Sequence, residues 1–81
     1  MCYFVYILKS EKDGRLYKGI SKDPMKRWKE HNSGKTMSTK GYRPWKLVFS
    51  ERLQSRIEAR NREKYFKSGR GRAYLRNILD L

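Results

Sequence analysis

The run CYFVYILK at residues 2–9 is apolar on both sides of any strand that it forms. Its β-branched and aromatic residues favour an extended chain. Successive side chains of a strand point to opposite faces, which separates Phe4, Tyr6 and Leu8 from Tyr3, Val5 and Ile7. A strand that is apolar on both faces has to be covered on both faces. The run therefore predicts a central strand between two layers.

An Asp-Gly pair at residues 13–14 follows this strand and predicts a hairpin turn. The return strand is expected over residues 15–20, with Tyr17 and Gly19 on one face and Leu16, Lys18 and Ile20 on the other. If the hairpin register aligns the two strands, Tyr6 and Tyr17 project to the same side of the sheet.

Helix-boundary residues mark the first helix clearly. Asp23 is a good N-cap, Pro24 suits the first helical position, and Gly34 is a C-terminal stop. Met25 and Trp28 have i, i+3 spacing and are expected to face the sheet. The segment that follows, residues 33–44, is predicted to be a loop that is longer than most connections, a length often associated with function.

A third strand is expected over residues 45–53, where Trp45, Leu47 and Phe49 alternate with Lys46, Val48 and Ser50. Ser55 followed by Glu58 forms a capping box that opens a second helix. This helix is predicted to run to about Lys67 and to end at SGRG, residues 68–71. Two i, i+4 pairs indicate a short last helix: Tyr74 with Ile78, and Leu75 with Leu79.

The expected order is strand, strand, helix, strand, helix, helix. This order predicts an α+β domain with a small, mainly antiparallel three-stranded sheet flanked by helices. A chain of 81 residues is long enough for one domain and too short for two, so residues 1–81 are expected to form a single domain.

The charge of the chain indicates a polyanionic partner. Lysine and arginine total 21 against 8 acidic residues, a formal net charge of +13. Such a field attracts nucleic acid foremost and an anionic membrane second, although a small soluble protein can also carry a solvated basic surface. Together, five lysines are predicted to form a patch that contacts phosphates: Lys18, Lys22, Lys26, Lys35 and Lys40.

Cys2 is the single cysteine, so a disulfide within the chain is excluded and a reducing cytoplasm is expected. One cysteine and one histidine cannot make a zinc site of the Cys and His kind. Residues 1–8 lack the basic leader and cleavage site of a signal peptide. Because no run approaches the roughly 20 apolar residues of a membrane span, membrane insertion is not expected. A small-molecule cofactor is not expected either.

Four short motifs in order resemble those of the GIY-YIG nuclease family: FVY at 4–6, YKG at 17–19, RWKEH at 27–31, and the glutamate in ARNREKYFK at 59–67. The chain is similar to the small stand-alone members and to the catalytic domain of the bacterial excision-repair nuclease. Phe4 and Lys18 stand where the family's motifs have glycine and isoleucine. Lys22 is the nearest substitute for a lysine after the second motif, and Asn77 is the candidate for a C-terminal asparagine.

The resemblance implies a three-stranded sheet between helices and a metal-dependent endonuclease. Phosphodiester cleavage needs an activated water and cations that meet the developing charge. By resemblance, Tyr17 is the favoured proton acceptor, with Tyr6 as its partner or as the alternative base. Arg27 would contact the scissile phosphate, and His31, at i+4 from Arg27, could orient a tyrosine. Glu63 would hold Mg²⁺, for which Mn²⁺ could substitute.

Two functions are open at this stage. The first is an endonuclease that hydrolyses DNA, selects structure more than sequence, and acts in repair or recombination. The second is a non-catalytic nucleic-acid-binding module that keeps the nuclease fold. RNA stays open as a substrate, as does the oligomeric state.

Overall fold

A computed structural model describes residues 2–79 and confirms the predicted α+β architecture. The elements are β1 (Tyr3–Ser10), β2 (Leu16–Ser21), α1 (Pro24–Ser33), α2 (Met37–Lys40), β3 (Trp45–Leu53), α3 (Arg56–Lys67) and α4 (Gly69–Leu79). The single domain predicted for residues 1–81 thus includes residues 1, 80 and 81, which lie outside the described part. Within that part, no helix is both long enough and apolar enough to cross a membrane.

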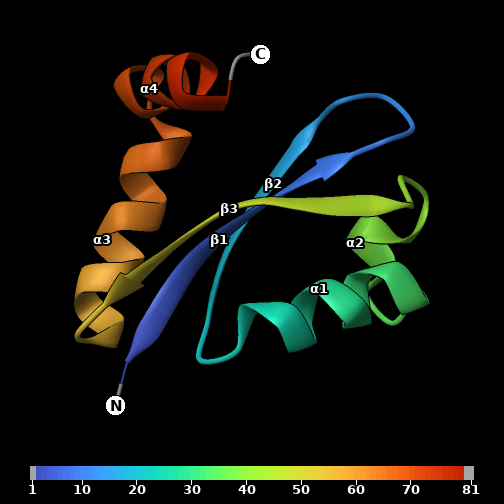
Figure 1. The fold of residues 1–81 in the computed structure, drawn as a ribbon, viewed down its shortest axis with the longest axis horizontal. Helices are drawn as coiled ribbons and strands as arrows, with labels where there is room; N and C mark the ends of the chain where they lie inside the picture. The colour runs from blue at the N-terminus through green and yellow to red at the C-terminus, as the bar shows by residue number, and fades with distance from the viewer. Residues whose placement is uncertain (1, 80–81) are drawn as a thin grey trace.

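The three strands form one antiparallel sheet in the order β2-β1-β3, with β1 in the centre. Helices α1 and α2 lie on one side of this sheet, and α3 and α4 lie on the other (Figure 1). The central strand is therefore covered on both faces, as its two apolar faces predict. Tyr6 and Leu8 pack with Trp45 on the α1 side, while Val5 and Ile7 belong to the core on the α3 side.

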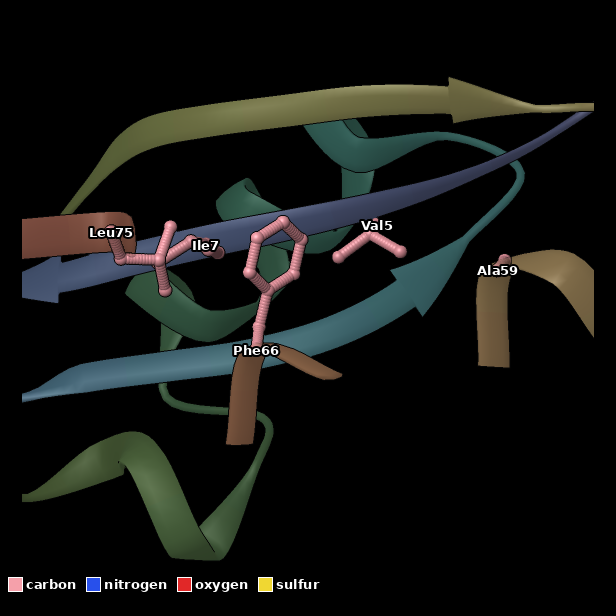
Figure 2. Packing of buried hydrophobic residues seen from close by; sticks show 5 residues of the cluster. All are labelled: Val5, Ile7, Ala59, Phe66 and Leu75. Carbon is pink, nitrogen blue, oxygen red and sulfur yellow. The ribbon is translucent and has the colours of Figure 1, made fainter. Parts of the chain in front are cut away.

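The core beneath α3 and α4 is a small aliphatic and aromatic cluster. Phe66 of α3 points its ring toward β1, between Val5 and Ile7 (Figure 2). Ala59 and Leu75 complete the cluster, and all its members are fully buried. A large apolar side chain buried in this way contributes about 1.5–3 kcal/mol. This cluster fixes α3 and α4 against the sheet.

A β-bulge in β3 corrects one prediction. Ile7 pairs with Phe49, but the next residue, Leu8, pairs with Leu47, so Val48 is an extra residue. Such an insertion shifts the alternation of side chains beyond it. Leu47 therefore packs on the α1 side, whereas Phe49 packs on the α3 side. The prediction that Trp45, Leu47 and Phe49 share one face was wrong for this reason.

Helix α1 begins and ends where the sequence predicts, but its first apolar side chain does not face the sheet as predicted. The Asp23 side chain accepts a hydrogen bond from the Lys26 backbone N–H, and Gly34 closes the helix in the left-handed region at φ +86°. Met25 was predicted to face the sheet, yet it is 50% exposed. One turn later, Trp28 does contact the sheet, because its Nε1 donates to the Trp45 carbonyl at 2.6 Å.

Two connections also differ from the prediction. The expected loop at 33–44 contains the short helix α2, and the indole of Trp45 donates to the Thr39 carbonyl of that helix at 2.9 Å. The SGRG segment ends α3 but also begins α4. Gly71 is buried, and a Cβ there would overlap the Tyr65 carbonyl oxygen. This glycine allows α4 to pack closely against α3.

Candidate active site

The register of the hairpin brings the two predicted tyrosines to the same face of the sheet. Tyr6 pairs with Gly19, and Leu8 pairs with Tyr17, which is the alignment on which the prediction depended. A Cβ on Gly19 would lie 2.6 Å from the Tyr6 hydroxyl oxygen. Because that distance is too short for any side chain, Gly19 leaves the space in which the Tyr6 ring crosses β2. Tyr6 is consequently only 1% exposed.

A chain of hydrogen bonds connects Tyr6 with α1 and α2. The Tyr6 hydroxyl lies 3.2 Å from His31 Nε2, and His31 Nδ1 lies 2.8 Å from Thr39 Oγ1. The Thr39 hydroxyl donates its one proton to the Thr36 carbonyl at 3.3 Å, so it accepts from His31 Nδ1. His31 Nε2 is then the acceptor, and Tyr6 donates to it.

Burial separates the protonation behaviour of these two groups. It raises the pKa of Tyr6 to about 12, and the nearby Arg27 opposes this rise. Burial lowers the pKa of His31, and the positive charge of Arg27 lowers it further. Near neutral pH, Tyr6 is therefore a protonated donor and His31 an uncharged acceptor.

Tyr17 lies at the edge of this cluster and is half-buried. Its ring centroid is 4.6 Å from that of His31 and 6.3 Å from that of Trp45. The Arg27 side chain is 39% exposed, and one of its guanidinium nitrogens lies 2.6 Å from Glu30 Oε1. An accessible phenol thus lies beside a cluster that includes a guanidinium, an arrangement suited to an anionic, phosphate-bearing substrate.

Comparison with protein families assigns the chain to a family. The model of the GIY-YIG catalytic domain matches residues 2–76. The chain belongs to the GIY-YIG family. Membership of this nuclease family implies a nucleic-acid substrate.

Similar proteins are small members of the same group. The UPF0213 protein YazA of Bacillus subtilis is 42% identical over 66 residues, which are 80% of this chain and 66% of that protein. A UPF0213 protein of Clostridium perfringens is 45% identical over 79% of this chain and 69% of its own length. The solution structure of a UPF0213 protein of Bacillus halodurans has a TM-score of 0.58 at 36% identity, covering 96% of this chain and 85% of that one.

Glu63, the candidate metal ligand of this GIY-YIG domain, lies in the other layer. Its carboxylate is 3.8 Å from Lys67 Nζ on α3. Lys67 in turn lies near Lys18 of β2 and lowers its pKa, so this flank of α3 faces the β2 edge. The Glu63 side chain is 20% exposed. Among residues 2–79 there is no group of three or more His, Cys, Asp and Glu side chains that could hold a metal.

The five predicted lysines do not form a single patch around the tyrosines. Lys18 lies on the opposite face of β2, in the groove beneath α4. The Lys22 ammonium lies 5.5 Å from the centroid of the Tyr3 ring. Lys26, Lys35 and Lys40 are exposed along α1, α2 and their connection. Period-two alternation along β2 explains the position of Lys18.

Sequence reasoning missed two residues that contact the predicted set. Thr39 fixes the tautomer of His31, and Glu30 pairs with Arg27. Glu30 lies at i+3 from Arg27, a spacing at which ion pairs form on helices. The pair could therefore have been predicted from the sequence. Thr39 carries no such signal, because its contact depends on how α2 folds back against α1.

His31 gives the site a pH dependence that can be measured. A histidine whose pKa is lower in the folded state stabilises the fold fully above its unfolded pKa of about 6.5. Because the unfolded chain binds the proton first, the free energy of unfolding should decrease as pH falls from about 7.5 to about 5.5. His31 is the only histidine, so one imidazole NMR signal reports its titration beside urea unfolding. An imidazole that titrates above 6.5 would contradict the burial effect.

Proposed function

We propose that the protein is a metal-dependent endonuclease that hydrolyses phosphodiester bonds in DNA. The observation that supports this most directly is the position of Tyr17. Its half-buried phenol lies at the edge of a buried Tyr6–His31–Thr39 chain, in a cluster that includes the Arg27 guanidinium. A potential proton acceptor thus belongs to the same cluster as a cation that can bind the phosphate.

The proposal assigns a different role to each tyrosine. Tyr17 accepts the proton of the attacking water, since it is the phenol that solvent reaches. Tyr6 holds its proton and donates it to His31, because its pKa is raised to about 12. Tyr6, His31 and Thr39 then act as positioning residues that fix the wall against which Tyr17 packs.

Arg27 binds the scissile phosphate in this proposal. A guanidinium has five N–H donors in a planar fork, so it can contact phosphate oxygens and its present partner together or in turn. The 2.6 Å pair with Glu30 holds the side chain at the surface of α1 before substrate arrives. A phosphate then competes with Glu30 for the same donors.

Glu63 is the proposed ligand for Mg²⁺, or for Mn²⁺ as a substitute. Mg²⁺ is commonly held by one or two carboxylates, several waters and substrate phosphates, so a single partly exposed carboxylate fits this ion. The long 3.8 Å pair with Lys67 leaves Glu63 able to take another cation. When bound, the metal would supply charge that stabilises the leaving oxygen.

The substrate is proposed to be DNA of a particular structure, in repair or recombination in the cytoplasm. A domain with principal extents of 30 × 28 × 17 Å has little surface for reading bases. Recognition of a branched or damaged DNA structure needs fewer base contacts, and so less protein surface, than recognition of a base sequence.

A second candidate is a binding module without catalysis. The position of Glu63 favours it, because α3 covers the face of the sheet opposite to the one that carries Tyr6 and Tyr17. Catalysis requires that the metal at Glu63 reach the phosphate around the β2 edge.

The decisive experiment incubates the purified protein with labelled DNA duplexes, branched and single-stranded forms, and RNA. Each is tested with Mg²⁺, with Mn²⁺ and with EDTA. Cleavage of at least one substrate with metal, and its loss in EDTA, is the expected result. Binding without cleavage of any substrate would instead support the module.

A further inference from the structure

A basic groove lies on the side of the sheet opposite to Tyr6 and Tyr17. It has a volume of about 520 Å³ and runs between the β1–β2 hairpin and α4. Lys9, Lys18, Arg72 and Arg76 line it, together with Gly14 and Leu16. We call this the Lys18 groove. In the part of the chain that the structure describes, no carboxylate lines it.

The cations of the Lys18 groove are held together against their mutual repulsion. Lys18 is half-buried, and its pKa is lowered first by burial and then by the charges of Arg72 and Lys67. Arg72 and Arg76 lie at i, i+4 on α4, a spacing at which like charges destabilise a helix. An anion in the groove would relieve this repulsion.

The recessed shape selects among polyanions. Lys9 and Lys18 come from the hairpin on one wall, and Arg72 and Arg76 come from α4 on the other. A single sugar-phosphate backbone is narrow and negatively charged, so it can enter between two such walls. A lipid surface is broad and presents its headgroups in a plane, so it fits a convex basic face better than a recess.

We infer that the Lys18 groove binds the sugar-phosphate backbone of a nucleic acid, at a surface separate from the Tyr17 site. This inference rests on the proposed nucleic-acid substrate but not on its cleavage. The groove lies on one face of the sheet, and Tyr6 and Tyr17 lie on the other. The bound segment is therefore a different part of the nucleic acid from the one that reaches Tyr17.

The test compares two pairs of substitutions that remove equal charge. The groove variant is Arg72→Gln/Arg76→Gln on α4, and the control is Arg60→Gln/Lys64→Gln on α3. All four side chains are exposed, and each pair has i, i+4 spacing, so neither change should prevent folding. Lys18→Gln is a third variant, on the strand wall of the groove.

Affinity is measured by anisotropy with a fluorescein-labelled DNA duplex between about 50 and 200 mM NaCl. For every duplex phosphate that the protein no longer neutralises, the slope of log affinity against log salt becomes shallower by about 0.9. The groove pair should reduce the slope by about 1 to 2, and Lys18→Gln by about 1, while the control pair changes it much less. Equal slopes for the groove and control pairs would overturn the inference, as would a parent protein that does not bind DNA.

Two further measurements separate this inference from its alternatives. Co-sedimentation with phosphatidylserine vesicles tests the lipid alternative, and a groove variant that fails to bind vesicles but binds DNA like the parent would overturn the inference. A cleavage assay of the parent protein separates the inference from the proposed nuclease function. If the parent binds DNA but cuts none, and the groove pair still reduces the slope, the inference stands while the proposed nuclease function fails.

Discussion

Replacing Tyr17 with phenylalanine should slow DNA cleavage by about 10²–10⁴-fold, the usual contribution of a general base. The change removes one oxygen and keeps the ring contacts with His31 and Trp45, so the free energy of unfolding should change little. Single-turnover cleavage at saturating enzyme gives the rate of the chemical step. Urea unfolding of the same variant shows that the fold is intact.

Tyr6→Phe is the matched control, because it removes the same atom from the neighbouring strand. The Tyr6 hydroxyl is buried and donates to His31 Nε2. Its removal leaves a buried acceptor without a partner, which costs about 1–3 kcal/mol of stability. Tyr6→Phe should therefore be less stable than Tyr17→Phe but should cut faster.

The opposite pattern would reverse the two roles. If Tyr17→Phe cuts as fast as the parent while Tyr6→Phe is inactive, Tyr6 is the base and its pKa of about 12 in the free protein falls when substrate binds. If both variants match an active parent, neither phenol accepts the proton.

Glu63→Gln should lower cleavage by orders of magnitude while DNA binding stays similar or improves. The variant keeps the size of the side chain but loses the charge that would hold Mg²⁺. Removal of a negative charge near phosphates also favours the complex. The long, partly exposed pair with Lys67 is worth no more than about 0.5 kcal/mol, so the fold should survive.

Glu51→Gln is the matched control for charge. Glu51 on β3 is also paired with a cation, Arg62, at 2.8 Å, and its replacement changes the net charge by the same amount. Cleavage by Glu51→Gln should stay close to that of the parent across a Mg²⁺ titration. Parent-like cleavage by Glu63→Gln in the same titration would make Glu63 an ordinary partner of Lys67.

The sequence by itself determined the elements whose signals are local. The apolar run at 2–9 is a central strand, Asp23 and Gly34 bound α1, and the antiparallel hairpin register places Tyr6 and Tyr17 on one face. These features depend on backbone preferences and on period-two alternation of side chains. Both are set by residues that are close together in the sequence. The two tyrosines of the hairpin, and the arginine and histidine at i, i+4 on the first helix, could therefore be named as candidate site residues before the fold was known.

The features that only the tertiary structure decided are contacts between segments distant in sequence. The bulge at Val48 is defined by pairing with β1, and Thr39 reaches His31 only because α2 folds back on α1. Gly71 interrupts a helical pattern in sequence, yet it lies where α4 packs closely on Tyr65. Lys18 joins Arg72 and Arg76 across the hairpin–α4 groove, because burial on the second face of the sheet, and not spacing along the chain, brings these charges together.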